Sequence, residues 1–406
     1  MKVLYIYTTA STINGSVQNK VIAQIDALNS IGSLCRGLFL STDKIEQSEN
    51  YPNIDFLHVP KIRAKYFRSS KQKSAYFLTL LNQKLYDIDE FDFVYFRYPG
   101  AHPLLNQWLK KHKNKVFFEH VTAETEEIKM YKRENPFEIN LSSFLSYLEF
   151  YFLPLIREKI YGKSIRNLAL FGICNSDDIA HYERKMAGNV YKTLVLGDAV
   201  QTEKFPIKKP TILGQEFRMI FLKGAATNAD FNGLDRVFYG MKNYKGNYNL
   251  KLYLFGKNLE SEKKLIQKLE IEEMVICSGF IQQNEVDEIL NQMHIGIGAL
   301  AVHRKGLKST STIKTREYCA RGLPFIFGHF DTDFSYSDEA QRFCLQEPAS
   351  DDSIDFGFVI SWYQNIQLEA NIETKMRDFS LKHLEYIFKM KKLLTFINDN
   401  NYKKIN

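Results

Sequence analysis

The chain has 406 residues, of which 45% are hydrophobic and 25% are charged. This length and composition are typical of a globular protein with two domains, and they argue against a disordered or fibrous chain. The net charge of +7 is moderate and accompanies no recognisable nucleic-acid-binding motif, so we expect no nucleic-acid partner.

The start of the chain leads directly into the strand-like segment Val3–Tyr7, without the charged and apolar regions of a signal peptide. The most apolar stretch, Phe144–Ile156, contains Glu149 and Pro154 and is too short to span a bilayer. The five cysteines are scattered and form no CxxC pair, which favours reduced thiols. We therefore expect a cytoplasmic protein that can associate with the inner face of the cell membrane.

Short apolar runs alternate with segments of helical period along the first half of the chain. Val3–Tyr7 predicts a strand, a polar loop reaches Gly15, and a helix follows with apolar residues on one side. The further strands that we expect are Leu34–Leu40, Phe56–Val59, Phe91–Phe96, Val116–Glu119, Ala169–Cys174 and Thr193–Leu196. Lys129–Arg166 is typical of a long helical insertion. The alternation predicts a doubly wound parallel sheet.

A basic segment at residues 61–73 stands out in this half. Its cations are Lys61, Arg63, Lys65, Arg68, Lys71 and Lys73. Tyr66 and Phe67 lie among them, and a basic, aromatic segment can bind an anionic membrane surface or an acidic acceptor. A solvated surface segment explains the same composition equally well.

The polar segment 198–216 contains Pro206, Pro210 and Gly214 and predicts a linker between two domains. Beyond it the alternation restarts. The strands that we expect there are Met219–Leu222, Leu250–Phe255, Val275–Cys277, Ile295–Ala299 and Phe325–Phe327. We therefore predict two Rossmann-like α/β domains at residues 1–203 and 204–384, with a C-terminal helix at 385–406 that packs back on the first domain.

The segment Ile295–Phe334 carries most of the chemistry in the second half. It is typical of a strand, a basic loop, a helix and a second strand. Arg304, Lys305 and Lys308 lie in the loop, and the hydroxyl residues 309–312 lie at the helix start. A helix N-terminus has unpaired N–H groups and a partial positive charge, so this pattern predicts an anion-binding site.

Lys314, Glu317 and Arg321 share one face of the same helix by their spacing. An ammonium group beside a phosphate and a carboxylate beside ribose hydroxyls suit a nucleotide-sugar. An ordinary solvated helix face with an ion pair is the alternative. Loops after the C-terminal ends of strands are where open α/β sheets bind ligands, although surface loops are also often basic for solubility.

Glu119 and His120 end a predicted strand, ahead of a polar segment that includes Thr122. The histidine could bind a sugar or relay a proton, and the glutamate could bind a hydroxyl or stabilise positive charge. Strand-end capping and a surface carboxylate are the alternatives. Gly15, followed by Ser16, could let the backbone approach a phosphate or an acceptor, or simply form a turn; this loop is no GxGxxG motif.

Asp331 and Asp333 resemble a DxD metal motif. They follow the last predicted strand of the second domain, and we expect no metal ion to bind them.

The block STSTIKTREYCARGLP, from Ser309 to Pro324, resembles the donor-site helix and Gly-x-Pro turn of GT-B glycosyltransferases. Within that fold it resembles the retaining family 4, of the capsule and surface-polysaccharide type. The Gly15 loop, the Gly197–Val200 turn, Gly224 and Ser278–Ile281 agree with this resemblance, which extends over essentially the whole chain. It implies two domains facing a cleft, with the acceptor on the first and the nucleotide-sugar on the second.

The resemblance also implies roles for particular residues. It implies donor contacts at Gly224, Gly256, Phe280, Ile281, Arg304, Lys305, Lys308, Ser311, Thr312, Ile313, Lys314 and Glu317. It implies catalytic roles for His120, Glu119 and Lys314, and an acceptor side that includes Gly15, Ser16 and Thr122. The chain departs from the family at three places. Ser309 stands where the family has the first of two glutamates, and Ala225 and Asn232 stand where it has an arginine and a lysine.

We therefore expect a glycosyltransferase that moves a sugar from a UDP- or GDP-type donor to a hydroxyl of a glycan or lipid-linked oligosaccharide. The resemblance implies surface-polysaccharide synthesis with retention of anomeric configuration, and neither a cofactor nor a catalytic metal. The alternatives are an inverting or non-catalytic protein of the same fold, or a nucleotide-sugar epimerase.

Overall fold

The structure, a computed structural model, describes residues 1–8, 16–41, 51–58, 78–81, 87–134, 148–223, 230–256, 260–279 and 283–402. The chain forms two compact units. Unit 1 comprises Met1–Leu196 together with Tyr386–Asn406, and unit 2 comprises Gly197–Glu385. The segment 198–216, expected as a linker, belongs to unit 2, where the N–H of Lys208 donates to the carbonyl of Arg321 at 2.8 Å.

Unit 1 contains a seven-stranded sheet in the order β3-β2-β1-β4-β5-β6-β7, and every pair of neighbours is parallel. The strands are β1 (Lys2–Tyr7), β2 (Leu34–Ser41), β3 (Ile54–His58), β4 (Phe93–Arg97), β5 (Val116–His120), β6 (Gly172–Cys174) and β7 (Thr193–Val195). Each coincides with a predicted strand within a few residues. The predicted parallel sheet of the first domain is confirmed.

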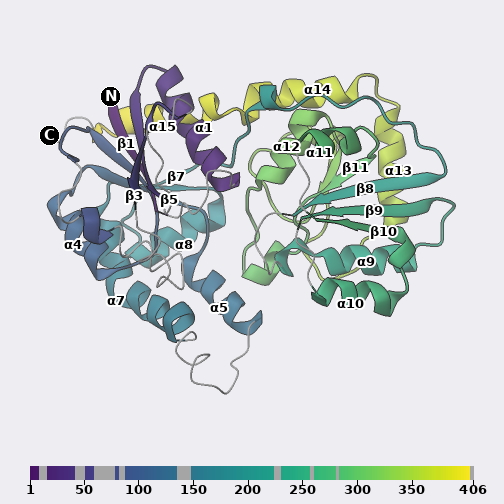
Figure 1. Cartoon of the computed structure of the whole chain (residues 1–406), viewed down its shortest axis with the longest axis horizontal. Coiled ribbons are helices and arrows are strands. Elements are labelled where there is room, and N and C mark those ends of the chain that lie inside the picture. The colour runs from purple at the N-terminus through teal and green to yellow at the C-terminus, as the bar shows by residue number, and fades with distance from the viewer. Residues whose placement is uncertain are drawn as a thin grey trace. The chain divides into compact units, whose positions relative to one another are not determined.

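Helices pack around the sheet of unit 1, and several of them connect its parallel strands. They are α1 (Ser16–Ser30), α4 (Pro103–Lys111), α5 (Glu124–Glu134), α7 (Leu153–Leu168), α8 (Asp177–Ala187) and, from the far end of the chain, α15 (Tyr386–Asp399). Figure 1 shows α15 running beside α1, and the two helices are in contact. The predicted insertion Lys129–Arg166 covers part of α5, a short π-helical turn (Leu148–Phe152) and most of α7; residues 135–147 lie outside the described residues.

Unit 2 contains a six-stranded parallel sheet in the order β10-β9-β8-β11-β12-β13. Its strands are β8 (Glu216–Leu222), β9 (Asn249–Phe255), β10 (Val275–Ser278), β11 (Ile295–Ile297), β12 (Phe325–Phe327) and β13 (Cys344–Gln346). The first five were predicted. The sixth was not, because a three-residue edge strand that ends in an exposed glutamine gives no clear apolar signal.

Helices cover both faces of the second sheet. They are α9 (Leu234–Asn243), α10 (Glu260–Leu269), α11 (Gln283–Leu290), α12 (Ile313–Arg321), α13 (Phe356–Gln367) and α14 (Ile372–Phe379). Residues of β8 alternate between two cores: Phe217, Met219 and Phe221 join the core under α9, α10 and α13, whereas Ile220 joins the core under α11, α12 and α14. Figure 1 shows α11 and α12 on the opposite side of this sheet from α9 and α10.

No helix in the described part of the chain is both long enough and apolar enough to cross a bilayer.

Gly296 in β11 is expected to tolerate no side chain. A Cβ atom at this position would lie 2.6 Å from the ring of Tyr318, which is completely buried and cannot move aside. Gly296→Ala should therefore lower the free energy of unfolding of unit 2 by about 1–3 kcal/mol through overpacking. Urea denaturation with pulsed hydrogen exchange resolves the two units and measures the loss.

The matched control is Gly214→Ala, which meets no atom within 4 Å and should change the same free energy by less than about 0.5 kcal/mol. Equal stability of the two variants would contradict the tight packing at Gly296.

Candidate functional site

The order of strands in unit 2 reverses between β8 and β11. Strands β9 and β10 follow β8 on one side, and β11, β12 and β13 extend from its other side. Open α/β sheets bind ligands outside the C-terminal ends of the strands at such a reversal. Lys223, which follows β8, and the loop that leads from β11 to α12 both start at this place. Unit 2 therefore offers its main candidate binding site here.

Lys314 lies in the first turn of α12 and reaches toward β8. Its ammonium lies 3.7 Å from the centre of the Phe221 ring and donates to the side-chain oxygen of Asn232 at 3.3 Å. Burial and the positive charge of Lys223 lower the pKa of Lys314 to about 7, although Glu317 opposes this shift. A bound anion would raise the pKa of this lysine again and thereby make it fully protonated.

Lys223 is a second cation at the same place, and the sequence analysis missed it. Its ammonium forms an ion pair with the carboxylate of Glu262 in α10. The adjacent turn needs Gly256, whose φ is +107° and whose Cβ would lie 2.8 Å from the carbonyl oxygen of Lys223. The predicted donor residue Gly256 therefore allows the ends of β8 and β9 to approach one another.

Arg304 is held by carboxylates of unit 2. Its guanidinium donates to both oxygens of Asp235 at 2.9 and 2.8 Å and to Asp351 at 2.8 Å. These hydrogen bonds raise the pKa of Arg304. His303 also contacts Asp351, at 3.1 Å. Because two carboxylates already balance its charge, the geometry favours a role in which Arg304 fastens the loop to α9, and its predicted contact with a phosphate stays a prediction.

Lys305 and Lys308 differ from Arg304 in their surroundings. The Lys305 ammonium lies 3.5 Å from the centre of the Phe231 ring, so a cation–π contact holds it. Lys308 is exposed. Their predicted contacts with a phosphate stay predictions.

The hydroxyl residues at the start of α12 have partners within unit 2. Ser311 Oγ accepts the N–H of Asp198 at 2.6 Å and is buried. Thr312 is the residue before the helix, and its hydroxyl lies 3.0 Å from that of Thr315 in the first turn. The Thr312 side chain makes no cap hydrogen bond to α12, so the start of this helix is a candidate for binding an anion.

Glu317 lies one turn after Ile313 on the same helix and is half-buried. Burial raises the pKa of its carboxyl group, whereas Arg321 and Lys314 act in the opposite direction. Arg321 itself pairs with Asp287 at 2.7 Å. Glu317 therefore lies close to the cation that the sequence placed at the donor, and its predicted contact with ribose stays a prediction.

The aspartates of the DxD-like motif bind an arginine. The guanidinium of Arg316 pairs with Asp331 and with Asp333, at 2.6 Å for the latter, and all three side chains are buried or nearly so. Within the described residues, no group of three or more histidine, cysteine, aspartate or glutamate side chains could hold a metal ion. Asp331 and Asp333 are thus explained by a buried ion pair.

Glu119 in unit 1 is the centre of a buried polar cluster. Its carboxylate pairs with Lys20 at 3.1 Å and with Arg97 at 3.3 Å, and it accepts hydrogen bonds from Gln24 at 3.1 Å and Tyr5 at 3.0 Å. Burial alone would raise its pKa, but Lys20 and Arg97 outweigh burial and lower the pKa to about 2. Glu119 is therefore a permanent anion with four partners, an arrangement that favours a role in holding β1, β4 and β5 together.

His120 points to the other face of β5, as successive strand residues do. Its side chain is fully buried, with Nδ1 3.3 Å from Glu183 and Nε2 3.3 Å from the hydroxyl of Tyr191. Burial, and then Arg166, lower its pKa well below the usual value, so the ring is neutral. A direct contact between His120 and a substrate requires that these neighbours move, and its predicted catalytic role stays a prediction.

The structure describes only some of the remaining predicted site residues. Ser16 begins α1, and Thr122 lies half-buried in the turn between β5 and α5. Gly15, Gly224, Phe280, Ile281 and the basic segment 61–73 lie outside the described residues.

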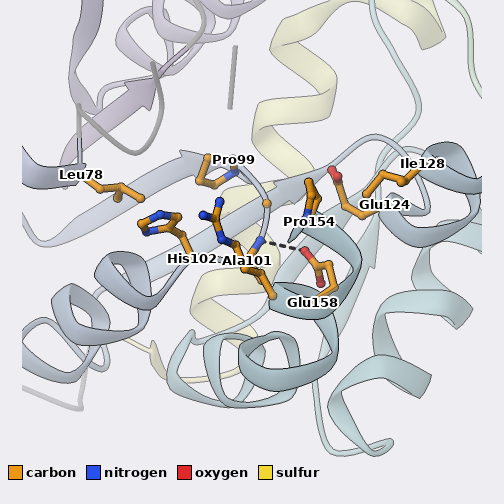
Figure 2. Close-up of a pocket in the computed structure, with 10 residues that line it drawn as sticks. Leu78, Pro99, Ala101, His102, Glu124, Ile128, Pro154 and Glu158 are labelled. Carbon is orange, nitrogen blue, oxygen red and sulfur yellow. Dashed lines mark hydrogen bonds between the residues drawn. The ribbon is translucent and has the colours of Figure 1, made fainter. Parts of the chain in front are cut away.

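Unit 1 contains a small pocket that the sequence did not indicate (Figure 2). It lies between the loop after β4 and the helices α5 and α7, and its lining includes His102, Glu124, Arg157 and Glu158. Glu158 accepts the N–H of Ala101 at 2.8 Å, which is the dashed line in Figure 2. The volume of about 20 Å³ accommodates one water molecule or one hydroxyl group, so a nucleotide cannot bind here.

The fold is shared with solved structures of glycosyltransferases. Sucrose-phosphate synthase from Thermosynechococcus elongatus superposes with a TM-score of 0.64 at 12% identity, covering 98% of this chain and 99% of that chain. HepE from Anabaena in complex with UDP and glucose superposes with a TM-score of 0.63 at 11% identity and similar coverage (98% and 99%). WaaG, a glycosyltransferase involved in lipopolysaccharide biosynthesis, gives a TM-score of 0.59 at 12% identity, covering 96% and 98%.

These superpositions identify the class of fold: the chain has the two-domain GT-B fold of glycosyltransferases. No protein-family model matches the sequence, and no curated protein matches it either.

Proposed function

We propose that this chain is a glycosyltransferase that takes its sugar from a nucleoside-diphosphate sugar and binds the diphosphate in unit 2. The observation that carries the proposal is the meeting of Lys223 and Lys314 at the reversal of strand order, next to the start of α12. Glu262 balances the charge of Lys223, whereas burial and the charge of Lys223 lower the pKa of Lys314, so a negatively charged ligand would stabilise the charged form of Lys314.

The position of Lys314 also compensates for one residue in which the chain differs from the family that it resembles. Asn232 stands where that family carries a lysine, and the ammonium of Lys314 lies 3.3 Å from the side chain of Asn232. A cation is thus supplied at this place by α12, although the residue at 232 is neutral. The start of α12 adds the N–H groups of its first turn and a partial positive charge.

In the proposed reaction, the bond between the anomeric carbon of the sugar and the diphosphate oxygen breaks, and the acceptor oxygen forms a new bond to that carbon. The acceptor hydroxyl releases its proton to the departing diphosphate. Lys223, Lys314 and the start of α12 stabilise the negative charge that develops on the leaving group. Retention of configuration and a glycan or lipid-linked acceptor are supported by the sequence resemblance, and HepE is a structural neighbour solved with UDP and glucose.

A panel of UDP-, GDP-, ADP- and dTDP-sugars tests the proposal. At a concentration about 100 times its dissociation constant, a ligand that binds only the folded state stabilises it by about 2.7 kcal/mol and raises the melting temperature. We expect at least one of these donors to do so. A chain that binds none of them would contradict the proposal.

The same panel separates an enzyme from a binding protein of the same fold. Slow release of free nucleoside diphosphate from the bound donor indicates transfer to water and hence catalytic competence. Binding without release, even with added glycan acceptors, would favour a non-catalytic role. Nuclear magnetic resonance of the product anomer then distinguishes retention from inversion.

A further inference from the structure

The hydroxyl of Tyr318 lies between the ends of strands β8 and β11. It accepts the N–H of Leu222 at 3.2 Å and lies within donating distance of the carbonyl oxygens of Ile297 at 3.4 Å and Ile220 at 3.5 Å. The side chain reaches this place from α12 and is completely buried. A phenol therefore contacts the backbone of both strands that border the candidate donor site.

This hydroxyl occupies the place of a backbone hydrogen bond. The ladder between β8 and β11 pairs Ile295 with Met219 and ends where Gly296 pairs with Ile220. In a regular parallel ladder of this register, the next hydrogen bond joins the N–H of Leu222 to the carbonyl of Ile297. The Tyr318 hydroxyl contacts both of these atoms, so it links the two strands while holding them further apart than a direct bond does.

The two residues that border this insertion lead into the candidate site. Lys223 follows Leu222 directly, and the loop to α12 begins after Ile297. Lys314 precedes Tyr318 by one helical turn, so both side chains project from the same face of α12. The position of one hydroxyl group thus sets the spacing between the backbone that carries Lys223 and the helix that carries Lys314.

The ring of Tyr318 has little freedom to move. Gly296 lies directly against it, with no room for a Cβ atom, and the ring packs near Phe325 with centroids 6.3 Å apart. Burial raises the pKa of the phenol, so the hydroxyl keeps its proton and can donate and accept at once. These contacts hold the hydroxyl in place before any ligand arrives.

We propose that Tyr318 is a positioning residue for the donor diphosphate: its hydroxyl replaces a backbone hydrogen bond between β8 and β11 and sets the spacing between the ends of these two strands. The proposal rests on the proposed function. It assigns Tyr318 no contact with the substrate. Without the hydroxyl, Leu222 and Ile297 either pair directly, which brings the ends of β8 and β11 closer together, or lose a partner, which leaves Lys223 less well placed.

Tyr318→Phe tests the proposal by removing the hydroxyl alone. The dissociation constant of the nucleoside diphosphate that the unmodified chain binds should rise about three- to tenfold, as for the loss of one hydrogen bond. The dissociation constant of the corresponding nucleoside, which has no phosphate, should stay unchanged. Both constants are measurable by isothermal titration calorimetry or by ligand-observed magnetic resonance.

Tyr363→Phe is the matched control. Tyr363 is buried in the same unit, and its hydroxyl also donates to a backbone carbonyl, that of Thr211 at 3.2 Å. Its removal should leave both dissociation constants unchanged. If Tyr318→Phe matches this control, or weakens nucleoside and nucleoside diphosphate equally, the hydroxyl serves stability alone and the proposal is overturned.

Hydrogen exchange on the unmodified chain provides a test that does not depend on a folded variant. Nucleoside diphosphate should slow the exchange of the Leu222 amide more than the nucleoside does, because the diphosphate fixes the ends of β8 and β11, where this amide lies. Equal exchange with both ligands would overturn the proposal. If the unmodified chain binds no nucleoside diphosphate, the proposed function itself fails, and this inference fails with it.

Discussion

Lys314→Met is expected to weaken the binding of a nucleoside-diphosphate sugar about 10- to 100-fold at pH 6. The ammonium of Lys314 is the cation that α12 directs to the end of β8, and a hydrogen bond to a charged group is worth about 1.5–3 kcal/mol. Methionine keeps most of the apolar part of the side chain and removes the ammonium group, with its charge and its hydrogen-bond donors. Isothermal titration calorimetry measures the loss.

The same residue predicts how binding depends on pH. The pKa of Lys314 is lowered to about 7 in the free protein, and a bound diphosphate raises it again. Well below pH 7 the lysine is charged in both the free and the ligand-bound protein, so the affinity does not change with pH. Above pH 7 binding takes up a proton, so the affinity should fall about fivefold from pH 7 to pH 8 and about tenfold for each further pH unit. A nucleotide-sugar suits this test, since neither of its phosphates titrates near neutral pH.

Three variants separate this explanation from a general effect of pH. Lys314→Arg keeps the positive charge at every pH, so it should bind the nucleotide-sugar well, with an affinity that does not change with pH. Lys314→Met should bind it weakly, again with an affinity that does not change with pH. Lys242→Met removes an exposed lysine of unit 2, paired with Glu270, and should behave like the unmodified chain. A sloped profile that persists in Lys314→Met would rule out Lys314 as its source.

Arg166→Met is expected to lower the free energy of unfolding of unit 1 by about 3–5 kcal/mol, because it leaves buried carboxylates without a counter-charge. The guanidinium is completely buried, lies 2.5 Å from Glu183 and 3.0 Å from Glu158, and donates to the hydroxyl of Tyr98 at 3.2 Å. Glu183 also contacts His120. Loss of Arg166 therefore disturbs the surroundings of the histidine that the sequence placed at the acceptor.

Urea denaturation measures this loss, since each unit contains one tryptophan. In a Trp362→Phe background, Trp108, which is completely buried in unit 1, reports the unfolding of that unit alone. Arg36→Met is the control: it breaks an exposed pair with Asp55 at 2.9 Å and should cost about 0–1 kcal/mol.

The double variant Arg166→Met with Glu183→Met should recover part of the stability, because it also removes one of the unpaired charges. If Arg166→Met alone is as stable as Arg36→Met, the charge of Arg166 does not stabilise the buried carboxylates, and the prediction is wrong.

The architecture could be predicted because the spacing of apolar residues and the length of apolar runs are local properties of the sequence. Val3–Tyr7 and Leu250–Phe255 are long apolar runs between polar loops, and they form central strands. The strand Cys344–Gln346 is short and lies at the sheet edge, so nothing in its composition distinguishes it from a loop. The polar segment 198–216 has the composition of a linker but packs on unit 2, because buried Lys208 and Thr202 find partners there that the sequence does not reveal.

The sequence indicates which residues of the candidate site lie together only where those residues are also close in sequence. Lys314 and the start of α12 belong to one local pattern. Lys223 and Glu262 are 39 residues apart, and their ion pair depends on the sheet order. The partners of Arg304 are equally remote: Asp235 and Asp351 balance its charge, whereas the sequence shows only a basic loop.

The helix α15 makes unit 1 depend on residues that follow the whole of unit 2 in the sequence. It packs on α1, and Phe396 and Tyr402 contact Phe171 with centroids 5.0 and 5.2 Å away. On the ribosome, unit 2 can therefore finish folding before unit 1 does, although its residues emerge later. A premature stop codon just before Tyr386 would leave unit 2 whole and remove part of the core of unit 1.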